Sequence, residues 1–299
     1  TSDKATLAVA GLTSSCAQKN HNLLAAVRQA GNPDVYVFAD ADIGPGSGWL
    51  RELVLPLSHP GVTVTTGFRW LCGDGAKMGP MVHNSVNIFI YVLFSVASFL
   101  GEVGLWGGSM AIRREDFEAL DVVSVWGRSA VDDMSLSRAV VRSGKEAVMV
   151  PACITRSNDL LQTVRAGIGW FERQIMFLKA YYRRLWLCLA APVALLVLVF
   201  TFWLPWALLG SISQRRTFWG LGGAAPLVWF GGEAVVVLLY PLLGTIPHLG
   251  RFFVLQPFLR TTHLVSYLRT MFTNVITWSG VKYYLDRHGT VVKVERMAT

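Results

Sequence analysis

Two long apolar stretches constrain the fold of this chain more than any other feature. Residues 186–210 carry no charged side chain and have tryptophan towards both ends, a pattern typical of a membrane-spanning helix. Residues 218–244 form a second such stretch, with Glu233 inside it. An acid within a span is a functional candidate, or it faces a neighbouring helix. We therefore expect two crossings, which return the chain to the side on which it began.

The composition agrees with a membrane protein. Hydrophobic residues make up 53% of the 299 residues and charged residues 15%, whereas soluble domains carry about a quarter. The net charge of +8 indicates Lys and Arg beside anionic lipid on the cytoplasmic side rather than nucleic-acid binding, since no basic motif with interleaved aromatics occurs. The four cysteines form no CxxC pair, which argues against a zinc site or a disulfide framework and favours a reducing compartment.

The residues ahead of the spans have the pattern of an α/β domain. Short apolar runs typical of strands alternate with helical patterns, which predicts a mainly parallel sheet with flanking helices. The expected strands are residues 6–10, 35–39, 62–68 and 147–151. Because residues 6–10 resemble an inner strand and the chain starts at Thr1 without Met, we expect that the N-terminus is truncated.

Asp40 and Asp42 follow the apolar run 35–39 directly, ahead of a loop rich in glycine. Residues two apart in an extended chain point the same way, and ligands of open α/β sheets collect where strands end. Two carboxylates there suit Mg²⁺ or Mn²⁺ bridging the phosphates of a nucleotide. A solvated acidic turn that closes the strand explains the same two residues, and Asp-x-Asp alone does not decide between these readings.

Two further segments could contact a phosphate. Lys19 and Asn20 stand at the start of a helical pattern, where charge and the helix dipole favour an anion. A capped surface helix is the commoner meaning of such residues. Gly107 and Gly108 lie in a glycine-rich turn before a short strand, and glycine permits close backbone approach to a ligand. They are equally compatible with a plain turn.

Asp132 and Asp133 open a helix that ends near Gly144. Acids at a helix N-terminus are favoured by the dipole and by capping alone, which accounts for Asp132 without any catalytic role. For Asp133 we favour a catalytic role, because a paired acid can have a raised pKa and act as a general base.

Three helical segments are expected to lie at a membrane or beside a binding site. Residues 84–100 are apolar but contain Asn and Ser, and we favour a helix against the membrane or an acceptor channel over a crossing. Residues 159–185 predict an amphipathic interfacial helix, on which Trp170, Arg173 and Gln174 could also line a site. Residues 252–272 are expected to be interfacial or buried in protein.

The order of these features resembles the membrane-bound glycosyltransferases of the family-two type with a GT-A fold, and most of all the ceramide glucosyltransferases of family twenty-one. The strand ending in Asp40 and Asp42, the Gly-Gly-Ser turn, the Asp132-Asp133 helix and the aromatic–basic helix follow one another as in that family. The tail from Trp278 to Tyr284 is similar to the family's tryptophan–small–glycine–basic–tyrosine ending.

The resemblance implies inverting transfer of a hexose, expected to be glucose from UDP-glucose, to the hydroxyl of a ceramide-like membrane lipid. Asp40 and Asp42 would hold Mg²⁺ or Mn²⁺ and the nucleotide diphosphate. Asp133 would be the general base, and Asp132 would take the place of the acid that usually precedes it. The family has Arg before Trp170, but this chain has Gly169 there, with Arg165 and Arg173 flanking it as candidate replacements.

The expected organisation has four parts: a catalytic domain at 1–158, the interfacial helix at 159–185, membrane and interfacial helices at 186–275, and a basic, hairpin-like tail at 276–299. The protein would be integral to a membrane with its catalytic domain in the cytosol, in the Golgi or ER if eukaryotic and the inner membrane if bacterial. Three alternatives stay open. They are another lipid acceptor such as a hopanoid or diacylglycerol, a processive polysaccharide synthase, and a non-catalytic membrane homologue.

Overall fold

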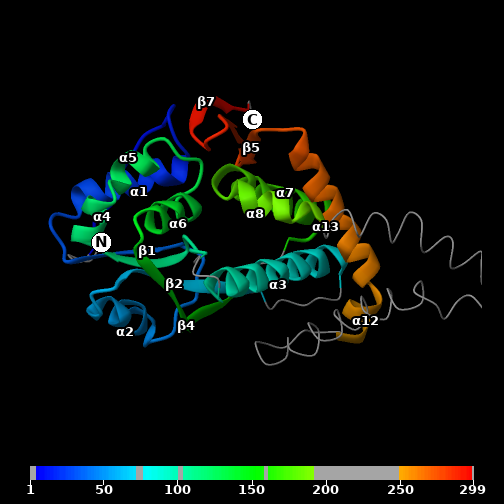
Figure 1. The fold of residues 1–299 in the computed structure, drawn as a ribbon, viewed down its shortest axis with the longest axis horizontal. Helices are drawn as coiled ribbons and strands as arrows, with labels where there is room; N and C mark the ends of the chain where they lie inside the picture. Colours follow the sequence, from blue (N-terminus) through cyan, green and yellow to red (C-terminus); the bar gives the residue numbers. More distant parts are fainter. Residues whose placement is uncertain (1–4, 72–76, 100–103, 158–160, 192–248, 298–299) are drawn as a thin grey trace, which may run out of the picture.

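The structure is a computed structural model that describes residues 5–71, 77–99, 104–157, 161–191 and 249–297. Its α/β part is a four-stranded sheet in the order β1-β3-β2-β4. The strands are β1 (Val35–Ala39), β2 (Val62–Leu71), β3 (Ser109–Arg113) and β4 (Glu146–Ser157). Figure 1 shows this sheet with helices on both of its faces.

The prediction of a mainly parallel sheet is wrong, because β3 runs antiparallel to both β1 and β2 and only β2 and β4 pair in parallel. The register explains the reversal. Ser109, the first residue of β3, lies opposite Ala39, the last residue of β1, so β3 enters the sheet at the edge where β1 leaves it. The sheet is therefore mixed, and the carboxyl ends of β1 and β2 share the edge at which β3 begins.

The strand expected at residues 6–10 does not form. Leu7 and Val9 are 86% and 81% exposed, and no strand in the described part of the chain pairs with them. A backbone without a partner gains no ladder hydrogen bonds, so apolar alternation alone does not make a strand. Within the described residues β1 is an edge strand and most of it is only half-buried, in contrast to the strand buried on both faces that its apolar sequence predicts.

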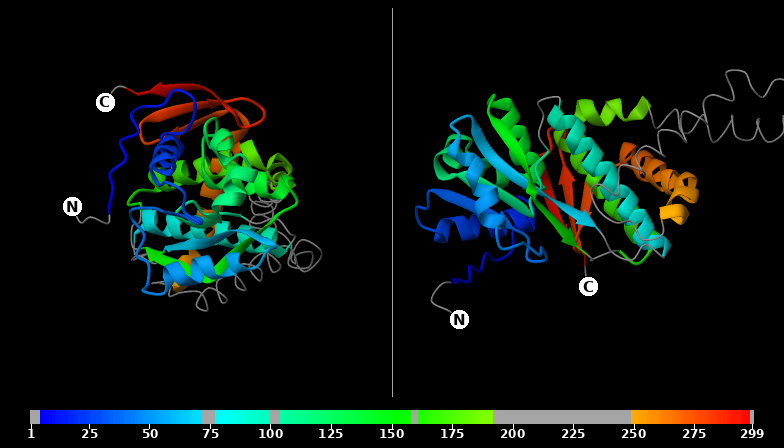
Figure 2. Two further views of the ribbon diagram at one scale, coloured as in Figure 1. Left: turned by 90° about the vertical axis from the view of Figure 1, so that its left-hand side faces the viewer. Right: turned by 90° about the horizontal axis from the view of Figure 1, so that it is seen from below.

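Helices cover the two faces of the sheet unequally. One face packs against α1 (Gln18–Gln29), α4 (Arg114–Ala119), α5 (Val122–Trp126) and α6 (Asp133–Arg142) around a core that includes Phe38, Phe117 and Trp126. The other face is covered by α2 (Trp49–Val54) and a 3₁₀ turn (Leu55–Ser58). In Figure 2 α1 and α2 lie on opposite sides of the strands. This packing fixes the N-termini of α1 and α6 beside each other.

A second group of helices lies beyond the sheet edge. It comprises α3 (Met78–Phe99), α7 (Val164–Tyr181), α8 (Arg183–Cys188), α12 (Leu249–Val254) and α13 (Gln256–Met271). The polar residues of α3 are used within the protein: Asn87 accepts from Leu71 N at 3.1 Å and donates to Arg69 O at 2.9 Å. In the parts of the chain that are described, no helix is long and apolar enough to cross a membrane. Most of the two spans expected at 186–210 and 218–244 falls in residues 192–248, outside the described part.

The helix expected over residues 159–185 is two helices, because Tyr182 leaves helical geometry between α7 and α8 (φ −130°, ψ 56°). α7 packs against α3 and α13, and its Phe171, Ile175 and Tyr181 are buried. His263 of α13 is buried too, with its Nε2 3.3 Å from the Ser85 hydroxyl of α3. One face of α13 is covered by protein, but Phe258, Val265, Leu268 and Met271 on the same helix are exposed, so both placements left open for residues 252–272 stay predictions.

The hairpin predicted in the tail is confirmed. Strands β5 (Val275–Trp278), β6 (Val281–Leu285) and β7 (Val291–Arg296) form a second sheet, antiparallel throughout. Its first turn is tight, with Ser279 and Gly280 at φ 47° and 75°. This sheet contacts the α/β part, since the Tyr283 hydroxyl accepts from Gln18 N at 3.2 Å. In Figure 1 it lies above α7, close to α1 and α6.

Candidate active site

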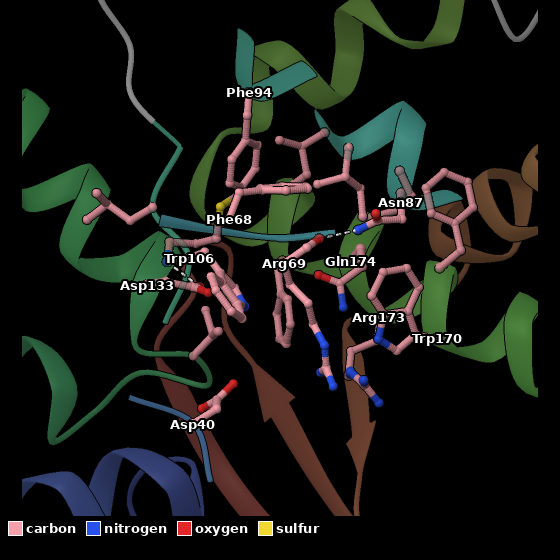
Figure 3. A pocket seen from close by; sticks show the side chains of 18 of the residues that line it. Asp40, Phe68, Arg69, Asn87, Phe94, Trp106, Asp133, Trp170, Arg173 and Gln174 are labelled. Atoms are coloured by element: carbon pink, nitrogen blue, oxygen red, sulfur yellow. Dashed lines mark hydrogen bonds between the residues drawn. The ribbon is translucent and has the colours of Figure 1, made fainter. Parts of the chain in front are cut away.

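A cavity of about 400 Å³ opens where the sheet edge, α3, α6, α7 and β5 meet. Figure 3 shows it with Asp40 and Asp133 on one side and Trp170, Arg173 and Gln174 on the other. Of the predicted residues, the cavity is lined by Lys19, Asp40, Asp42, Asp132, Asp133, Trp170, Arg173 and Gln174. Segments far apart in the sequence therefore converge on one cavity, as the order of motifs predicts.

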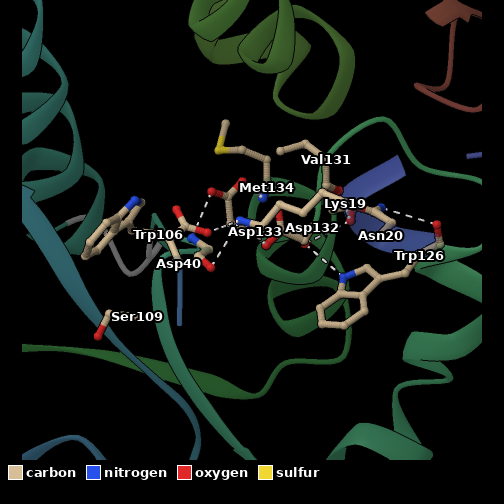
Figure 4. A network of polar contacts seen from close by, with 12 residues as sticks. Lys19, Asn20, Asp40, Trp106, Ser109, Trp126, Val131, Asp132, Asp133 and Met134 are labelled. Carbon is tan, nitrogen blue, oxygen red and sulfur yellow. Dashed lines mark hydrogen bonds and ion pairs between the residues drawn. The ribbon is translucent and has the colours of Figure 1, made fainter. Parts of the chain in front are cut away.

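Lys19 is the centre of the acidic side of the cavity (Figure 4). Its Nζ lies 2.9 Å from Asp40 Oδ1 and 3.0 Å from Asp132 Oδ2, and it donates to Gly107 O at 3.2 Å. Burial opposes the protonated form, but the charges of Asp132 and Asp40 outweigh it and raise the pKa of Lys19 above its ordinary value. Lys19 is therefore a fixed cation between the strand end and the start of α6.

The glycine turn is a close approach between backbone and site. A side chain at Gly107 would collide with the Asp132 carboxylate and with Lys19 Nζ, and one at Gly108 would collide with Trp106 and Asp40. Neither position can therefore carry a Cβ without displacing the charged groups. The turn is therefore packed closely against side chains of the site, while approach of its backbone to a ligand stays a prediction.

Asp133 lines the cavity with its carboxylate held by the backbone. Its Oδ2 accepts from Gly107 N at 3.0 Å and its Oδ1 from Met134 N at 2.6 Å. Burial, followed by the negative charge of Asp132, raises the pKa of Asp133 to about 7, while the charge of Lys19 and the two amides act against the rise. A carboxyl that titrates near neutral pH can both take and release a proton there.

Asp132 has a different environment from its neighbour. Its side chain is 1% exposed and pairs with Lys19, and neither carboxylate oxygen has a well-aligned hydrogen-bond donor. A buried charge without donors is expensive unless a cation lies beside it. Asp132 therefore depends on Lys19, and its charge in turn acts on Asp133.

The two acids of the strand end both have cationic partners. Asp40 pairs with Lys19, and Asp42, which is 50% exposed, pairs with Arg69 at 2.6 Å. Among the described residues, no group of three His, Cys, Asp or Glu side chains is placed to hold a metal ion. As hard oxygen donors, the two carboxylates fit a divalent cation that takes its remaining ligands from a bound diphosphate. The metal assignment of Asp40 and Asp42 stays a prediction.

On α7 the structure distinguishes the two arginines that flank Gly169. Arg173 lines the cavity, and its guanidinium carbon lies 5.4 Å from the ring centroid of Trp278. Arg165 is exposed and does not line the cavity. A Cβ at Gly169 would meet nothing within 4 Å, so no packing requirement explains this glycine.

The rest of the cavity wall is apolar. Side chains from β2, α3 and α7 continue the cavity away from the carboxylates. They include Phe68, Ile90, Leu93, Phe94, Phe171 and Leu178. The cavity thus combines a charged side, where proton transfer could occur, with a wall that suits a hydrocarbon chain.

One predicted ligand-binding residue lies elsewhere. Asn20 is fully buried and donates to Trp126 O and Ser129 O, both at 3.2 Å, so it ties α1 to the loop before α6. Sequence reasoning missed three of the residues that line the site: Arg69, His83 and Trp106. Arg69 had a usable signal, since it is a lone cation near the carboxyl end of an apolar strand, the same edge as Asp40.

Comparison with solved structures finds proteins of low similarity. One is the mannosyltransferase PcManGT from Pyrobaculum calidifontis in complex with GDP-Man and Mn²⁺, at 17% identity and TM-score 0.45, covering 85% of this chain and 65% of that one. Another, described as a mycobacterial protein, has 21% identity and TM-score 0.39, covering 57% and 52%. The chain spans between half and two thirds of the length of these two structures. Comparison with curated proteins gives no match.

A family comparison is decisive. The model described as glycosyl transferase family 21 matches residues 2–291, nearly the whole chain. The match includes Lys19, the strand end at Asp40, the Asp132-Asp133 pair and the hairpin turn after Trp278. This protein therefore belongs to glycosyl transferase family 21.

Proposed function

We propose that this protein transfers a hexose, glucose from UDP-glucose in the first instance, to the hydroxyl of a ceramide-like membrane lipid with inversion at the anomeric carbon. The observation that carries the proposal is Asp133, a carboxyl with a pKa near 7 on the charged side of a cavity whose other wall is apolar. Membership of the family supports sugar transfer. The apolar wall supports a lipid as the acceptor.

The reaction is a single displacement. Asp133 takes the proton from the acceptor hydroxyl, and the oxygen attacks the anomeric carbon as the bond to the diphosphate breaks. The diphosphate leaves with the bonding electrons, and no covalent sugar–protein intermediate forms. Lys19 and Arg69 supply positive charge near the departing oxygens, and such electrostatic stabilisation often accelerates a reaction more than any other single effect.

A divalent cation would supply further charge neutralisation of the leaving diphosphate, held by Asp40 and Asp42 together with phosphate oxygens. Lys19 and Arg69 would then give up part of their pairing with these acids. Residence in a membrane, with the catalytic part in the cytosol, belongs to the same proposal and rests on the sequence of residues 186–244.

Transfer of labelled sugar tests the proposal. Membranes that contain the protein are incubated with labelled UDP-glucose and with a panel of lipids that includes ceramide, diacylglycerol and a hopanoid. Asp133→Asn should abolish lipid labelling, because the amide cannot take the proton. Asp34→Asn is the matched control, since Asp34 is exposed and away from the cavity. Labelling that survives Asp133→Asn removes this residue as the base, and absence of labelling on every lipid of the panel overturns transfer from UDP-glucose to these acceptors.

A further inference from the structure

Arg173 is a cation in the cavity that has no anionic partner in the described part of the chain. No described carboxylate forms an ion pair with it, and its guanidinium lies over the Trp278 ring. Burial lowers the pKa of Arg173 to about 10, because the guanidinium has lost much of its water. A buried charge is unfavourable unless something compensates it, so the side chain is suited to an anion that arrives with a ligand.

His83 adds a neutral hydrogen-bond donor beside this cation. Its Nδ1 accepts from Leu161 N at 3.2 Å, so the ring proton sits on Nε2. Burial, followed by the charges of Arg69 and Arg173, lowers the pKa of His83 to about 4. The histidine is therefore uncharged at neutral pH, and it lines the same cavity with only a donor left to offer.

Arg69 is the third basic side chain in this part of the cavity, after Arg173 and His83. It comes from β2 and pairs with Asp42, whereas Arg173 comes from α7, and in Figure 3 the two side chains extend next to each other in the cavity. Both arginines act electrostatically on His83, so the three basic side chains share one region. Apart from Asp42, which Arg69 neutralises, this region offers donors. Asp40 and Asp132 pair with Lys19, and Figure 3 shows Asp40 and Asp133 on the opposite side of the cavity.

We propose that Arg173, with the Nε2–H of His83 and with Arg69 alongside, forms a binding subsite for a phosphate group in this cavity. This proposal rests on the proposed function, because the sugar donor of that reaction carries phosphate into the cavity. Arg173 is the residue that would bind this phosphate. A guanidinium binds phosphate through two parallel N–H bonds, which a lysine at the same place would not reproduce.

Two sources can deliver the phosphate. One is the diphosphate of the sugar donor, and the other is the headgroup of an acidic lipid lying along the apolar wall. The chemistry of recognition is the same, so the experiment uses a separate probe for each source. UDP represents the donor, and a short-chain phosphatidic acid represents the lipid.

Calorimetric titration of the purified full chain with each probe tests the subsite without any turnover. Arg173→Gln should weaken binding of at least one probe by about ten- to a hundredfold, the loss expected for a charge-assisted, bidentate contact. Arg173→Lys should recover only part of it. Arg165→Gln is the matched control on the same helix, because Arg165 is exposed and does not line the cavity.

The outcomes separate cleanly. Weaker binding of UDP alone places the donor diphosphate on Arg173, and weaker binding of phosphatidic acid alone places the lipid phosphate there. Equal binding by Arg173→Gln and Arg165→Gln overturns the proposal, as does wild-type protein that binds neither probe. Asp133→Asn should bind both probes as the wild type does but should not transfer sugar. The test can therefore overturn the phosphate subsite and the role of Asp133 as base independently of each other. The melting temperature of Arg173→Gln should change little, because the substitution removes a half-buried charge whose contact is the Trp278 ring.

Discussion

Replacing Asp132 by asparagine should move the acidic limb of the pH–rate profile to lower pH. The base must be deprotonated to act, so the rate rises with pH through the pKa of Asp133, which lies at about 7. After burial, the charge of Asp132 is the main cause of that raised pKa. Asparagine has almost the same shape without the charge, and Lys19 keeps its pairing with Asp40. The pKa of Asp133 should therefore fall.

The size of this effect can be worked out. A like charge at close range shifts a carboxyl pKa by about 1–3 units, and we take about one unit because the nearby Lys19 offsets part of the repulsion. At pH 6 a base of pKa about 7 is roughly 10% deprotonated, whereas a base of pKa about 6 is half deprotonated. Relative to its own plateau, Asp132→Asn should be about fivefold faster than wild type at pH 6.

The assay is kcat/KM for sugar transfer between pH 5 and 9, with each variant normalised to its plateau. Normalisation matters because the substitution also changes the partner of Lys19 and can lower the plateau itself. Asp34→Asn should follow the wild-type curve, since Asp34 is exposed and away from the cavity. A limb that stays in place, or that moves to higher pH, refutes the reasoning: either the pair does not set this pKa or Asp133 is not the base.

Three more substitutions test the surroundings of the base. Lys19→Met should move the acidic limb of the pH–rate profile to higher pH, because the charge of Lys19 lowers the pKa of Asp133. It also leaves the buried Asp132 unpaired, so the unfolding free energy in denaturant titrations should fall by about 3–5 kcal/mol. Gly107→Ala should lower kcat/KM by at least about tenfold, because the added methyl group displaces charged groups of the site. Gly46→Ala is the control and should have the wild-type kcat/KM, because a Cβ there meets nothing within 4 Å. Tyr181→Phe removes a buried hydroxyl that bonds Ala130 N and Gly289 O, and it should lower stability in the same titrations by about 1–3 kcal/mol; an unchanged transition midpoint would contradict that role.

Much of the charged side of the cavity could be predicted from the sequence. Strand ends, glycine turns and helix starts are local features with recognisable patterns, and Asp40, Gly107 and Asp133 each occupy one of them. The family resemblance then supplied their order. What local pattern could not supply was the direction of β3, since alternation of apolar residues is the same for a parallel and an antiparallel strand.

The meeting of Arg69 and His83 could not be predicted from the sequence, for a different physical reason. Arg69 and His83 belong to a strand and a helix whose apolar neighbours predict burial, and nothing in either segment says that these two side chains meet. Their meeting depends on α3 folding back over β2, where Asn87 bonds the backbone of Leu71 and Arg69. Asn20 shows the converse: it is a polar residue beside Lys19 whose side chain lies outside the cavity and donates to the backbone before α6.

The sheet of β5, β6 and β7 determines when, during synthesis of the chain, the cavity can close. The acidic residues that line the cavity all precede residue 134, but Trp278, which lines it beside Arg173, is made long after them. The Tyr283 hydroxyl then bonds the amide of Gln18, a contact between residues 265 positions apart. The ribosome must therefore have synthesised the chain through Tyr283 before the cavity can close, so a shorter nascent chain contains the carboxylates without the wall that Trp278 supplies.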